Sequence, residues 1–71
     1  MNNNPLSWLP SYTKRGIFKK VGDTIESSGY RDERLIFNEI KNKYFAGDIP
    51  ATHKNAYLYV INKKLKEMKH D

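Results

Sequence analysis

The stretch "HKNAYLYVINKKLKEMK", residues 53–69, decides the fold, because its apolar and polar side chains recur at the spacing of an amphipathic helix. Pro50 prevents a helix from continuing into this segment from upstream, and Thr52 is an available N-cap. We expect the helix to end at Met68 or Lys69. Its apolar face has Leu58, Ile61, Leu65 and Met68, and its polar face has Asn55, Tyr59, Asn62, Lys66 and Lys69.

Two earlier segments show the same helical period. We expect the first helix over residues 13–27, with Thr13 as N-cap and Gly29 in the left-handed conformation that ends many helices. The second should start after the N-cap Asp32 and stop at Gly47, which permits a positive φ. Their buried stripes should contain Phe18, Val21 and Ile25 with Ile17 beside them, and Ile36, Phe37, Ile40 and Tyr44.

The fold class follows from these three helical segments. No segment alternates apolar and polar residues with the period of a strand. We therefore predict an all-α fold, a single small three-helix domain over residues 11–71 that follows an extended N-terminal arm over residues 1–10.

The arm contains "PLSWLP", which Pro5 and Pro10 bound and bias toward extended backbone. The polar residues 1–4 are expected to be loosely held. Trp8 and Leu9 allow two interpretations. They either cover the core of a domain that is short of apolar area, or form an exposed anchor for a partner protein.

The composition excludes several classes of protein. The 71 residues contain no cysteine, which rules out disulfide frameworks, thiolate zinc sites and cysteine nucleophiles. The longest apolar run is far shorter than the ~20 residues of a membrane span, and the first residues lack a signal-peptide pattern. We expect a cytoplasmic protein.

Catalytic motifs are absent from the sequence. Asp32 and Glu33 are adjacent, so on a helix they point about 100° apart and suit capping better than acid–base hydrolysis. His53 and His70 have no obvious third metal ligand and are interpreted as surface histidines. We therefore expect a non-enzymatic protein with no metal and no cofactor.

The polar face of the last helix is the strongest functional signal. Asparagine can make bidentate contacts to adenine, lysine reaches phosphates or guanine, and tyrosine can stack on bases or bond to phosphate. A solvated helix face with no partner is the alternative interpretation. The candidate nucleic-acid-binding residues on this helix are Asn55, Tyr59, Asn62, Lys63, Lys66 and Lys69.

A second basic cluster lies on the first helix, and we expect it on one broad side opposite the buried stripe. Such cations could hold phosphates while the last helix reads a groove, as in a helix-turn-helix module. The turn "AGDIPAT" is longer than the about three to four residues of that motif, and a solvated face is the alternative. The cluster consists of Lys14, Arg15, Lys19 and Lys20.

Charge along the chain agrees with an anionic partner, since residues 1–20 and 41–71 each sum to +4 and residues 21–40 to −3. The first hypothesis is a small regulator, for example of transcription, that binds nucleic acid, with DNA as the expected form. The alternative is a protein-interaction module, an adaptor, inhibitor or homodimer. Its candidate contact residues are Trp8, Leu9, Tyr30 and Tyr59.

Overall fold

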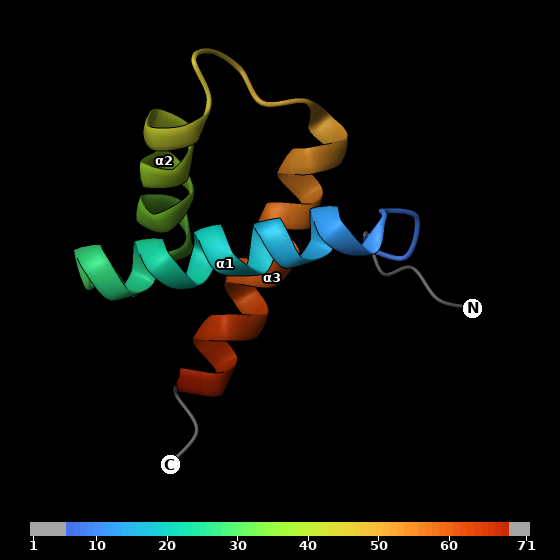
Figure 1. Cartoon of the computed structure of the whole chain (residues 1–71). Coiled ribbons are helices and arrows are strands. Elements are labelled where there is room, and N and C mark those ends of the chain that lie inside the picture. The colour runs from blue at the N-terminus through green and yellow to red at the C-terminus, as the bar shows by residue number, and fades with distance from the viewer. Residues whose placement is uncertain (1–5, 69–71) are drawn as a thin grey trace.

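A computed structural model describes residues 6–68 and confirms the small all-α fold. It contains α1 (Ser11–Ser28), α2 (Glu33–Tyr44) and α3 (Ala51–Met68). In Figure 1, α1 crosses α3 near its middle, and α2 stands beside the C-terminal half of α1. Each pair of helices is in contact, so the three share one core. In residues 6–68 no helix is both long enough and apolar enough to cross a membrane.

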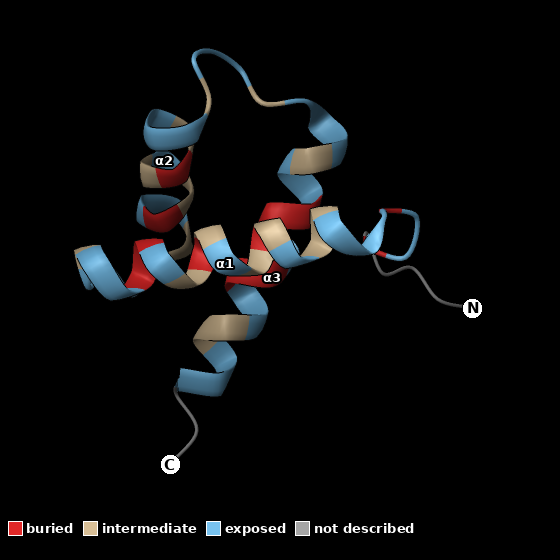
Figure 2. Ribbon diagram, viewed as in Figure 1, coloured by how far each residue is buried: buried red, intermediate tan, exposed pale blue. Residues whose placement is uncertain are grey.

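The core lies where the three helices face one another, as the red segments of Figure 2 show. Burial of its side chains removes apolar surface from water and is the main source of stability in so short a chain. Phe45, just after α2, packs edge-on against the ring of Tyr57 at 5.7 Å between centroids. The buried apolar residues are Leu6, Leu9, Ile17, Val21, Ile25, Ile36, Ile40, Ala56, Tyr57, Val60 and Ile61.

α1 begins earlier than the sequence predicts. Pro10 is its N-cap, with φ −61° and ψ 155°, and no side chain caps the helix. Thr13 lies inside the helix, so its predicted capping role is wrong; the fixed φ of proline already suits a helix start. Gly29 adopts the predicted left-handed conformation with φ 75°, and its N–H donates to the carbonyl of Ile25. Phe18 is only partly buried.

α2 has the predicted N-cap, because a carboxylate oxygen of Asp32 accepts a 2.8 Å hydrogen bond from the Arg34 N–H. Its end differs from the prediction. The helix stops at Tyr44, and the backbone of Phe45 is already extended. Within residues 6–68 only Gly29 has a positive φ, so Gly47 is not a left-handed stop. The Tyr44 ring is 40% exposed rather than buried.

α3 begins at Ala51, which places the predicted cap Thr52 inside the helix. The Pro50 carbonyl accepts the N–H of Lys54 at 2.8 Å. The buried face is turned relative to the predicted stripe, because Tyr57, Val60 and Ile61 now form its centre. Of the predicted apolar face only Ile61 is fully buried; Leu58 and Leu65 are partly buried and Met68 is exposed.

The described part of the arm is a turn, so the predicted extended conformation is wrong there. The Leu9 N–H donates to the Leu6 carbonyl at 3.1 Å, which turns both leucines toward the core. Trp8 lies between them and is 54% exposed. The prediction treated Trp8 and Leu9 as a pair, but a turn directs neighbouring side chains to different sides. Residues 1–4 lie outside the described part of the chain.

Candidate nucleic-acid interface

The polar face of α3 is exposed along the helix. α1 and α2 both pack on the side of α3 that holds Tyr57, Val60 and Ile61, so the opposite side faces solvent. Lys63 is exposed at the edge of this face, and Lys69 lies outside the described residues. We call the following set the α3 polar face: Asn55, Tyr59, Asn62, Lys63 and Lys66.

The polar groups of this face have no partners among residues 6–68. The two asparagine amides and the two lysine ammonium groups take part in no hydrogen bond or ion pair there. The one acidic residue of α3, Glu67, lies one turn after Lys63 and forms no ion pair with it. The donors and acceptors of this face therefore interact with water and remain free for an incoming ligand.

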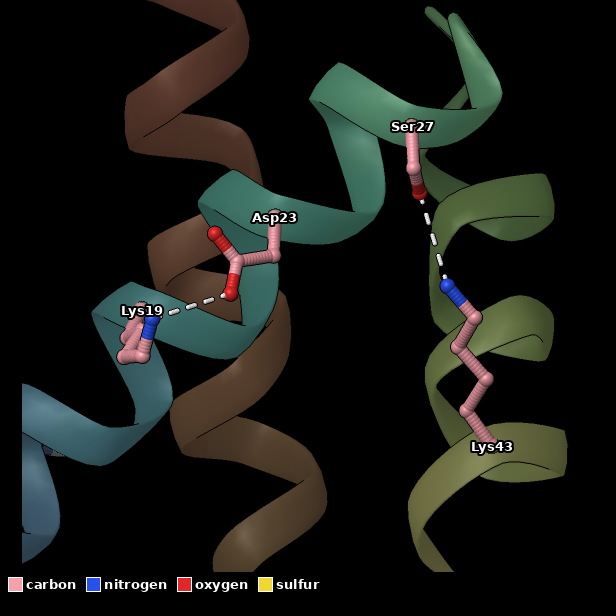
Figure 3. A network of polar contacts seen from close by, with 4 residues as sticks. All are labelled: Lys19, Asp23, Ser27 and Lys43. Carbon is pink, nitrogen blue, oxygen red and sulfur yellow. Dashed lines mark hydrogen bonds and ion pairs between the residues drawn. The ribbon is translucent and has the colours of Figure 1, made fainter.

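The cations of α1 point in several directions. Lys19 pairs with Asp23 at 3.2 Å, one turn further along the helix (Figure 3). Lys20 lies over the ring of Tyr44, 5.1 Å from its centroid, next to α2. Arg15 is exposed and Lys14 is partly buried. The four side chains do not share the one broad side that the sequence predicts.

The structure does not bring the α1 cations onto the α3 polar face. Val21 of α1 and Val60 of α3 are both fully buried in the core between the two helices. Since each helix turns its buried side toward the other, their exposed sides point away from each other across the domain. The exposed Arg15 and Lys19 therefore lie on a different side of the domain from the α3 polar face. The division of labour, with α1 on phosphates while α3 reads a groove, stays a prediction.

The aromatic residues of the alternative hypothesis are dispersed. Trp8 precedes α1 and Tyr30 follows it, so the length of the helix, about 27 Å at 1.5 Å per residue, separates them. Leu9 is only 7% exposed and unavailable as a contact. The sequence analysis missed Tyr12, which at 73% is the most exposed large apolar side chain described. The sequence does indicate that Tyr12 is exposed, because position 12 lies outside the buried stripe of α1.

The residues considered for acid–base catalysis or metal binding include Asp32, His53 and His70. Asp32 caps α2, and its carboxylate also lies 3.7 Å from the Arg34 guanidinium. His53 is partly buried, with an enclosed Nδ1 that has no hydrogen-bond partner, so it is less exposed than the sequence predicts for a surface histidine. His70 lies outside the described residues. Among residues 6–68 no three potential ligands gather where they could hold a metal ion.

Comparison with protein-family models, with curated proteins and with solved structures finds no match to this chain.

Proposed function

We propose that the protein is a small non-enzymatic regulator that binds nucleic acid through the α3 polar face, with DNA as the expected form. One observation supports this most directly: asparagine, tyrosine and lysine side chains lie together on the exposed side of one helix with their hydrogen-bonding groups unpaired. A surface that served solubility alone would need charge but no particular order of amides and aromatic rings.

The shape of α3 suits a duplex groove. The helix is 18 residues long, and its C-terminal part extends beyond α1 (Figure 1). The major groove of B-DNA, about 12 Å wide, admits an α-helix. With α3 in the groove, the Asn62 amide can pair with an adenine edge while the Lys66 ammonium contacts a phosphate.

The test is fluorescence anisotropy of a labelled duplex at several salt concentrations. Binding should be micromolar or tighter at low salt, and log K should fall with log salt at a slope of roughly −3 to −5 if several lysines engage. Lys66→Ala should weaken binding on every sequence and flatten the slope by about one unit. Asn62→Ala should cost about 1–3 kcal/mol on a preferred site only.

Matched controls come from α2, on which Asn42 and Lys43 are exposed and Lys43 points toward α1. Asn42→Ala and Lys43→Ala should leave affinity unchanged. Absence of binding at about 50 mM salt and tens of micromolar protein would contradict the proposal, because the attraction between lysines and DNA phosphates is strongest at low salt.

A second candidate function is a protein contact at the N-terminal end of α1. Trp8 and Tyr12 are 54% and 73% exposed and lie four residues apart. Tryptophan and tyrosine are frequent hot spots of protein interfaces. A partner captured through this end should be lost with Trp8→Ala, whereas DNA affinity should not change. Since Trp8 is the only tryptophan, its emission would report the contact directly.

A further inference from the structure

A groove of about 710 Å³ lies between the C-terminal half of α1 and the last turns of α3. Figure 1 shows the two segments that line it, the green end of α1 and the red end of α3. Its floor includes the apolar side chains of Phe18, Ile25 and Met68. α2 does not cover it, because α2 contacts the other flank of α1, where Lys43 reaches Ser27 at 3.4 Å (Figure 3).

The charges on this flank of α1 are divided along the helix. At about 100° per residue, positions 12, 15, 19, 22, 26 and 29 form one stripe with alternating spacings of three and four. The first half of the stripe is basic, with Arg15 and Lys19. The second half is acidic, with Glu26 in the stripe and Asp23 beside it. A helix with this pattern is complementary in charge to an antiparallel copy of itself.

We propose that the groove is occupied by α1 of a second copy of this chain, in an antiparallel two-fold pairing. Arg15 of each copy then lies opposite Glu26 of the other, and Lys19 lies opposite Gly22 with Asp23 one position away. Tyr12 of each copy meets Gly29 at the end of the groove. The symmetric pairing makes every contact twice, as an isologous interface requires.

Gly22 supports a close approach of the two helices. A glycine in a helix interior is less favourable than alanine. Nothing within one copy crowds this position, since a Cβ added at Gly22 would meet no atom within 4 Å. At the middle of the stripe, the missing side chain lets the stem of Lys19 from the second copy lie against the α1 backbone.

The pairing leaves the α3 polar face uncovered, because that face points away from α1. The proposal therefore does not rest on nucleic-acid binding, and either can fail alone. Tyr12 is the one large apolar side chain of the stripe, so we expect weak self-association, with monomer at about 5 µM and a rising dimer fraction at about 100 µM and above.

Sedimentation velocity of the full chain over this concentration range tests the proposal. Arg15→Glu and Glu26→Arg, made separately, each place like charges opposite one another twice and should weaken dimerisation about tenfold. The double variant restores opposite charges and should return the dissociation constant to within about threefold of the starting protein. A fold defect would not be repaired in this reciprocal way.

Glycine substitutions supply a matched pair. A Cβ added at Gly16 also meets no atom within 4 Å, but Gly16 lies outside the stripe. Gly22→Ala should raise the melting temperature and weaken the dimer, whereas Gly16→Ala should raise the melting temperature only. A monomer at all concentrations would overturn the proposal and leave the groove to a different protein. A dimer that tolerates both single charge reversals would overturn the pairing.

Discussion

The two faces of α3 use similar residues for different purposes. Tyr57 and Tyr59 are two positions apart, yet the first is 2% exposed and the second 37%. Tyr57 packs against Phe45 within the core, whereas Tyr59 lies among free amides and ammonium groups. One face is held by shape and burial, and the other presents hydrogen-bonding groups that the protein itself does not use. Stability and ligand binding should therefore be separable by substitutions one or two residues apart.

The largest effect should come from the buried face. Ile61 is fully buried, so Ile61→Ala removes apolar contacts and leaves a cavity, at a cost of about 2–5 kcal/mol. In so small a domain this is a large part of the total stability. The neighbouring change Asn62→Ala, on the α3 polar face, should alter stability by at most about 0.5 kcal/mol. Thermal unfolding followed by circular dichroism measures both, and equal losses would contradict the division between the faces.

Much of the fold follows from local chemistry. Asp32 and Gly29 mark their helix ends as predicted, because a carboxylate cap and a left-handed glycine act through backbone groups within a few residues. Tyr44 could not be placed in the same way. The position of Tyr44 relative to the core depends on how α2 packs on its neighbours. The helical period alone assigns Tyr44 to the apolar face of the helix.

The orientation of α3 shows the same limit more clearly. Residues 56–61 are apolar almost without interruption, so several faces of this helix are equally suited to burial. Packing against α1 and α2 selects the face with Val60, which the predicted stripe did not contain. The α3 polar face was nevertheless located from sequence, because Asn55, Asn62 and Lys66 remain opposite the core after this rotation.

The arm offers the second test, with an intermediate effect. Leu9 is buried and Trp8 is half-exposed, so the two neighbours should differ in their contribution to stability. Leu9→Ala should cost about 2 kcal/mol, at the low end for a buried leucine because the arm can adjust to the loss. Trp8→Ala should cost at most about 0.5 kcal/mol.

Deletion of residues 1–10 should lower the melting temperature as Leu9→Ala does, because it removes both buried leucines of the turn. An unchanged melting temperature after this deletion would show that the arm contributes nothing to the core. The Trp8 side chain would then remain available purely as an anchor for a partner.

The smallest effect concerns the two tyrosines and appears only at alkaline pH. Burial, and secondarily the nearby Tyr44, raise the pKa of Tyr57 above its ordinary value of 10.0. The folded state thus holds the phenolic proton more tightly than the unfolded state does. This contribution to stability is complete below the unfolded pKa and is lost as pH rises through the folded pKa. Tyr57→Phe should remove that loss, so its stability should fall less steeply above about pH 10.

The comparison needs a matched variant that keeps the buried phenol. Tyr59→Phe does so and removes one phenol from the exposed face. Urea denaturation at a series of pH values should give Tyr57→Phe a shallower alkaline slope than both the unsubstituted chain and Tyr59→Phe. Equal slopes in all three proteins would mean that the Tyr57 hydroxyl is not shielded from water, and the contrast between the two faces of α3 would then be one of packing alone.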